Sequence, residues 1–136
     1  MKLRLIQILL FVFVQNIVFA QNGPGGFGDT TTSGSNNIVL WLDANTISQT
    51  DGTIVSAWND LTNESNNSSS PSSNEPVFET NELNGYPTVR FTAANSDYLT
   101  ISNDASLNPN RISYFIVGSY TSNTSGFSPF IIKTTD

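Results

Sequence analysis

Short apolar runs alternate along the chain with long stretches of Asn, Ser, Thr and Gly. No segment sustains the period of about 3.6 residues that marks an amphipathic helix. The apolar runs are rich in β-branched and aromatic residues and are separated by turn-forming residues, which favours short strands. The expected strands are 38–43, 54–58, 76–79, 87–92, 98–101, 112–120 and 130–133, and one helical turn is expected at 104–108.

Several local signals refine this pattern. The run Ile-Val-Leu-Trp-Leu-Asp at 38–43 is apolar on both faces, which is typical of a central strand covered on both sides. Asn84 and Gly85 both tolerate a positive φ and therefore predict a tight hairpin. Asn103 or Asp104 can cap the helical turn that follows. Together these signals predict an all-β fold, an antiparallel β-sandwich.

The N-terminus has the features of a secretory signal peptide. Lys2 and Arg4 precede an apolar run at 5–19, and Val18 and Ala20 form a small-residue cleavage site. A retained membrane anchor is the alternative, but polar residues interrupt the run before it reaches the roughly 20 residues of a span. We expect residues 1–20 to be removed, an extracellular or cell-surface protein, and no transmembrane segment after cleavage.

The next segment, 21–37, contains five glycines and almost no apolar side chain, so we expect a flexible Gly/Ser/Thr-rich leader. Residues 38–136 hold the predicted strands. The sequence ends three residues after the apolar run at 130–133, and intact domains avoid exposing such a strand because it promotes aggregation. We therefore expect 38–136 to be the N-terminal part of an incomplete sandwich domain.

Composition excludes several kinds of chemistry. The 136 residues include no Cys and no His, so the chain has no disulfide, thiolate nucleophile, Ser-His-Asp triad or His-ligated zinc. Without residues 1–20, three basic residues face eleven acidic ones, a net charge of −8. Three scattered cations predict no nucleic-acid binding. Carboxylate chemistry, calcium bound by oxygen atoms and uncharged binding surfaces remain.

Four segments in order resemble one family: Val-Leu-Trp-Leu-Asp-Ala at 39–44, Val-Ser-Ala-Trp-Asn-Asp at 55–60, Asn-Gly-Tyr-Pro-Thr-Val-Arg-Phe at 84–91 and Asp-Tyr-Leu-Thr-Ile at 97–101. The chain resembles the concanavalin A-like lectin/glucanase superfamily, and more closely the laminin G-like jelly-roll modules of secreted bacterial surface proteins. The resemblance spans roughly 23–133 and implies two antiparallel sheets packed face to face. The chain departs from the family at Thr92-Ala93 and at 62–65, both in loops.

Three aromatic residues are candidates for ligand binding. Trp58, Tyr86 and Tyr98 lie at strand ends or beside turns, where an aromatic face can stack on a sugar ring. The alternative for Trp58 is a place in the core, and Trp41 is expected there because its run is apolar on both faces.

Asp60 and Asp97 are candidate calcium ligands. Calcium prefers six to eight hard oxygen ligands, and other Asp and Asn residues lie near both positions in the sequence. The resemblance to laminin G-like modules, which often hold calcium at one rim, also favours this interpretation. The alternative is that both residues cap turns through their short side chains.

No catalytic residue is predicted. Glycosidases of the resembled superfamily place carboxylates at alternate positions of a strand, so that they share one face. Glu79 and Glu82 have an odd spacing, which predicts opposite faces. We expect a non-catalytic adhesion module that binds carbohydrate or another extracellular polymer. The alternatives are the N-terminal part of a polysaccharide-degrading enzyme of the same fold and an architectural spacer in a long adhesin.

Overall fold

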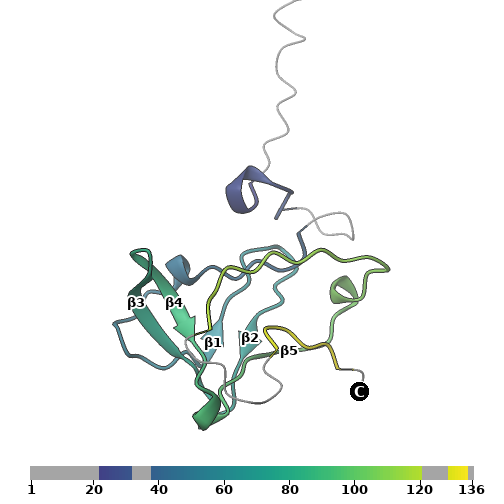
Figure 1. The fold of residues 1–136 in the computed structure, drawn as a ribbon. Coiled ribbons are helices and arrows are strands. Elements are labelled where there is room, and N and C mark those ends of the chain that lie inside the picture. The colour runs from purple at the N-terminus through teal and green to yellow at the C-terminus, as the bar shows by residue number, and fades with distance from the viewer. Residues whose placement is uncertain (1–21, 32–37, 121–128, 135–136) are drawn as a thin grey trace, which may run out of the picture.

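The structure is a computed structural model that describes residues 22–31, 38–120 and 129–134. Its strands form two antiparallel sheets, one with the order β1-β2-β5 and one that pairs β3 with β4 (Figure 1). The predicted all-β class is confirmed at this level, because the helices described are single 3₁₀ turns. The strands are β1 (Ala57–Trp58), β2 (Ser68–Ser69), β3 (Val77–Leu83), β4 (Tyr86–Arg90) and β5 (Thr100–Ile101), and the turns are η1 (Pro24–Gly26), η2 (Ala44–Thr46), η3 (Ala93–Asn95) and η4 (Ala105–Leu107).

The β3–β4 hairpin closes through the predicted two-residue turn. Leu83 pairs with Tyr86, and the residues between them, Asn84 and Gly85, have φ angles of 53° and 85°. Two successive positive φ angles are the signature of a type I′ turn, whose twist matches that of the flanking strands. The hairpin signal in the sequence is therefore confirmed.

A third segment, 52–55, runs antiparallel to the start of β3 and forms backbone hydrogen bonds with it. Gly52 N donates to Phe78 O at 2.9 Å, and Val55 N donates to Pro76 O at 2.8 Å. The main apolar core lies at this contact, where Val55 is 0% exposed and Phe78 is 3% exposed. These are the buried hydrophobic side chains of the described residues, so the apolar core is small.

The three-stranded sheet has one inward and one outward row of side chains. Trp58, Ser68 and Ile101 stand opposite one another across β1, β2 and β5. Residues paired in this way point to the same face of a sheet. Ser68 is buried while Trp58 and Ile101 are half-buried, so this row faces inward. The outward row is exposed and consists of Ala57, Ser69 and Thr100.

The central strand predicted at 38–43 is wrong. This segment is half-buried throughout and belongs to neither sheet. Trp41 N donates to the Asp60 carboxylate at 2.9 Å, and Trp41 O accepts from Leu61 N at 2.9 Å. A side chain thus takes the place of a neighbouring strand as partner, and no ladder of backbone bonds forms.

The strands predicted at 112–120 and 130–133 are also wrong. Both segments lack assigned strand structure where they are described, and their side chains are exposed. The rings of Tyr120 and Phe130 lie 4.7 Å apart, so the two segments meet near their ends. The β-branched and aromatic composition supplies strand propensity, but a strand also needs a neighbouring edge to pair with.

The signal peptide predicted at 1–20 lies outside the described residues, and the predicted leader at 21–37 is described only over 22–31. That part contains η1, and Thr30 is 7% exposed. Thr30 N donates to Asn22 Oδ1 at 2.9 Å, and Thr30 O accepts from Asn63 N at 2.8 Å. Within the residues that the structure describes, no helix has the length and apolar character needed to cross a membrane.

The predicted helical turn is present as η4, with Asp104 as its N-cap. The Asp104 carboxylate accepts from Ser106 N at 2.8 Å, which satisfies one of the donors at the start of the turn. This bond lowers the pKa of Asp104 below its ordinary value.

The hairpin turn yields a stability prediction. Gly85→Ala should lower the free energy of unfolding by about 1 kcal/mol, because a Cβ is strained at a φ of 85°. No neighbouring atom lies within 4 Å of that Cβ position, so a loss of stability would result from backbone strain alone. Urea denaturation measures the change, with Asn84→Gly as a control that keeps the permitted backbone. Equal destabilisation by both variants would contradict the turn assignment.

Candidate functional site

The Asp60 carboxylate is the centre of the most connected polar site. Its Oδ1 accepts from Trp41 N at 2.9 Å and from Thr62 N at 3.0 Å. Its Oδ2 accepts from Thr62 Oγ1 at 2.6 Å and from Asn66 N at 2.9 Å. One side chain thus joins the distant Trp41 amide to two amides and a hydroxyl of its own loop.

Two asparagines extend this site. Asp60 N donates to Asn67 Oδ1 at 2.8 Å, which closes the loop that begins after β1. Asn66 is 5% exposed, and its Nδ2 donates to Val39 O at 2.7 Å and to Ser106 Oγ at 3.0 Å. Through Asn66 the loop is connected to the 38–42 segment and to η4. Buried polar groups need such partners, because an unsatisfied one costs about 1–3 kcal/mol.

This geometry bears on the calcium prediction for Asp60. A carboxylate offers about four acceptor positions, and four donors already occupy those of Asp60. Asp97, the other candidate, accepts from Thr92 N at 2.8 Å and closes the loop around η3. Among residues 22–31, 38–120 and 129–134, no group of three or more Asp or Glu side chains is close enough to hold a metal ion.

The three aromatic candidates occupy different environments. Trp58 belongs to the inward row of its sheet, and its Nε1 donates to Asp43 O at 3.3 Å. Tyr86 is 63% exposed at the start of β4, and Tyr98 is 44% exposed just before β5. No ring contact joins the three in the described part of the chain. The two tyrosines are therefore solvent-exposed, whereas Trp58 is half-buried in the inward row.

The loop that carries Tyr98 is held by hydrogen bonds on both sides. Tyr98 N donates to Asn74 O at 3.0 Å, and Asn74 Nδ2 donates to Asn95 O at 3.2 Å and to Ser96 O at 3.0 Å. Ser96 has a φ of 57°, which turns the chain sharply after η3. A loop backbone fixed in this way loses little additional entropy when a ligand binds to it.

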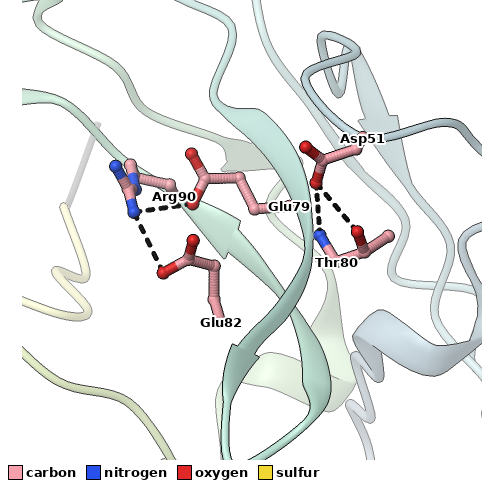
Figure 2. Close-up of polar contacts among 5 residues, drawn as sticks. All are labelled: Asp51, Glu79, Thr80, Glu82 and Arg90. Carbon is pink, nitrogen blue, oxygen red and sulfur yellow. Dashed lines mark hydrogen bonds and ion pairs between the residues drawn. The ribbon is translucent and has the colours of Figure 1, made fainter.

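The expected opposite orientation of Glu79 and Glu82 is wrong. The β3–β4 register shifts between Glu79 and Leu83, and Asn81 has a φ of 60° within this bulge. The extra residues bring both carboxylates to one guanidinium: Arg90 Nη2 lies 2.7 Å from Glu79 Oε2 and 3.2 Å from Glu82 Oε2 (Figure 2). A bulge breaks the alternation on which the expectation depended.

The two contacts of Arg90 differ in kind. Arg90 Nη2 donates a hydrogen bond to Glu82 Oε2, whereas Glu79 Oε2 is buried and accepts none from the described residues. The closer pair is therefore held by charge rather than by an aligned N–H. Both carboxylates are committed to the same cation, which is a structural arrangement rather than the separated pair that glycoside hydrolysis needs.

Asp51 secures the other side of the bulge. Its Oδ1 accepts from Thr80 N at 2.7 Å and from Thr80 Oγ1 at 3.0 Å (Figure 2). The backbone bond, followed by the side-chain bond, lowers the pKa of Asp51 below its ordinary value of 3.8. Asp51-Gly52 is a turn pair in the sequence, but its bond to Thr80 spans 29 residues and leaves no local signal.

Comparison with known proteins adds no relative to this picture. No protein-family model matches the chain, and neither a curated protein nor a solved structure matches it. The function must therefore be argued from the sequence and from the geometry described above.

The Asp60 site predicts a large effect on stability. Asp60→Ala leaves Trp41 N, Thr62 N and Asn66 N without their partner, so unfolding should become easier by about 3 kcal/mol. Thermal or urea denaturation followed by tryptophan fluorescence measures this change. Asp43→Ala is the matched control, because it removes only two exposed bonds, which Asn45 N and Asn45 Nδ2 donate to the Asp43 carboxylate. If Asp60→Ala loses no more stability than Asp43→Ala, the hydrogen bonds of Asp60 do not stabilise the loop.

The lowered pKa of Asp51 predicts a pH dependence. Because the folded-state pKa is depressed, the stabilisation is complete above the unfolded value and is lost as the pH falls through the folded value. Asp51→Asn should therefore flatten the decline of the melting temperature between about pH 5 and pH 2. Thr80→Val, which keeps the backbone donor, should flatten it less. An unchanged pH profile in Asp51→Asn would contradict the assignment.

Proposed function

We propose that the protein is an exported, non-catalytic adhesion module that binds carbohydrate or a similar uncharged extracellular polymer. The observation that carries this proposal is the solvent exposure of Tyr98 on a loop whose backbone is held by hydrogen bonds. A tyrosine in this setting offers an apolar face for a sugar ring and a wet hydroxyl for its polar groups. Tyr86 supplies a second solvent-exposed aromatic side chain at the β3–β4 turn.

The surface chemistry supports the same class of ligand. Charged residues make up 12% of the chain, and the loops consist mainly of Asn, Ser and Thr. Their hydroxyl and amide groups donate and accept hydrogen bonds without a net charge, as sugar hydroxyls require. The N-terminal signal and the resemblance to laminin G-like modules are consistent with display outside the cell. In this proposal the two small sheets belong to a concanavalin A-like sandwich.

Catalysis is the weaker alternative for the described residues. Glu79 and Glu82 share the single positive charge of Arg90 in ion pairs. An architectural spacer shares the fold and the export signal but lacks a ligand. Polysaccharide binding would therefore distinguish an adhesion module from a spacer. Release of sugar from the same polymers would instead indicate an enzyme.

A binding screen tests the proposal directly. The exported protein is screened on a glycan array with calcium and with a chelator. Tyr98→Ala should weaken binding about tenfold, because it removes a stacking face. A dependence on calcium that Asp97→Asn abolishes would assign the metal to the η3 loop.

Phe27→Ala is the control for this screen, since Phe27 is 76% exposed and lies outside the candidate loops. Equal loss in Phe27→Ala and Tyr98→Ala would contradict the role of Tyr98. If the folded protein binds no polysaccharide, the adhesion proposal fails and the spacer remains.

A further inference from the structure

The chain contains two Asn-Gly pairs, Asn22-Gly23 and Asn84-Gly85. Asparagine is a thermolabile residue, and a following glycine has no side chain to hinder attack of its backbone nitrogen on the asparagine side chain. That attack converts the asparagine to aspartate or isoaspartate without an enzyme. In a folded protein its rate depends on whether both reacting groups are free, so the surroundings of each pair decide how fast it reacts.

The Asn84-Gly85 pair is accessible at both reacting groups. Both residues are exposed, and neither the Asn84 side chain nor Gly85 N has a hydrogen-bond partner among the described residues. No described atom lies within 4 Å of the position that a Cβ on Gly85 would occupy. Water therefore reaches this pair, and no bond within the described chain restrains the asparagine side chain.

The Asn22-Gly23 pair is engaged at both reacting groups. Asn22 Oδ1 accepts a hydrogen bond from Thr30 N at 2.9 Å, and Gly23 N donates to Gly28 O at 3.3 Å. Gly23 is also buried, although Asn22 is exposed. Attack at this pair therefore requires that two hydrogen bonds break first.

The end of the β3–β4 hairpin can open without disturbing the rest of the sheet. Ring closure between Gly85 N and the Asn84 side chain requires a backbone conformation that a type I′ turn does not permit, so the turn must open for the reaction to proceed. Between the bulge in β3 and the turn, the ladder contains only the pair Leu83–Tyr86. A single pair beyond a bulge opens at a lower free-energy cost than the whole hairpin.

We propose that Asn84 deamidates spontaneously when this end of the hairpin opens, and that the hydrogen bonds of Asn22 protect it. Hydroxide removes the proton of Gly85 N, and this nitrogen attacks Asn84 Cγ. The bond from Cγ to the side-chain nitrogen breaks, and that nitrogen takes a proton from water and leaves as ammonia. Water then opens the cyclic imide. Cleavage between Gly85 N and Cγ yields aspartate, whereas cleavage between Gly85 N and the main-chain carbonyl carbon yields isoaspartate.

Either product changes the surroundings of Tyr86. Both add one negative charge at the residue before Gly85, close in sequence to this exposed aromatic side chain. Isoaspartate also routes the backbone through the former side chain and adds a methylene group to a two-residue turn whose geometry matches its strands. The modified hairpin end is therefore less stable. The proposal concerns the chemistry of the turn and does not depend on carbohydrate binding.

Peptide mass spectrometry of the exported protein, aged at neutral pH and constant temperature, tests the proposal. Cleavage after Glu82 and Arg90 releases residues 83–90, in which Asn84 is the sole asparagine, and cleavage before Asp29 releases the fragment that contains Asn22. Asn84 should be lost about tenfold faster than Asn22, because the reaction at Asn22 carries the added cost of breaking its two bonds. Loss of Asn22 as fast as that of Asn84 overturns the proposal.

Two controls separate the effect of structure from that of local sequence. In concentrated urea the two pairs should react at similar rates, because unfolding removes the bonds of Asn22 and glycine follows both asparagines. A tenfold difference that persists in urea overturns the protection of Asn22. Asn84→Gly is the matched variant, since it keeps the permitted turn but has no side chain to attack. Ion-exchange chromatography should show an acidic form accumulating in the wild type and much less of it in Asn84→Gly; equal accumulation in both overturns the assignment to Asn84.

Discussion

The hydrogen bonds accepted by the Asp60 carboxylate hold together parts of the chain that hydrophobic packing does not. In the described residues the buried hydrophobic side chains are Phe78, which belongs to β3, and Val55, which lies beside it. The 38–42 segment and the loop after β1 are instead joined by Asp60 and by the buried amide of Asn66. Charge-assisted hydrogen bonds of this kind have strict geometry, so they fix position as well as contribute stability.

Short-range features were predictable from the sequence, because the residues that cause them are adjacent. Asn84-Gly85 dictates its own turn, and Asp104 caps the helical turn that it precedes. The bulge in β3 was missed because it depends on Asn81 in a left-handed conformation and on Asp51, far away in the sequence. The pairing of Arg90 with both glutamates follows from that bulge and was missed with it.

The sequence indicates which candidate residues lie near turns, but it does not indicate which groups those residues contact. Tyr86 and Tyr98 are exposed near turns, as their positions in the sequence suggest. The polar partners of Asp60 come from 41, 62 and 66, and no local pattern reveals that a carboxylate replaces a neighbouring strand there. The strand predicted at 112–120 is wrong, because strand propensity produces a strand only where another edge is within reach.

The contact between Thr30 and Asn63 has a consequence for the order of folding. Any process that delivers the chain from its N-terminus, on a ribosome or through a translocation pore, releases Thr30 well before its partner. The N-terminal segment must therefore wait, without its bond, until the loop after β1 has emerged. Its docking therefore cannot precede the emergence of Asn63, and a pause in delivery between the two residues would prolong the time for which Thr30 lacks its partner.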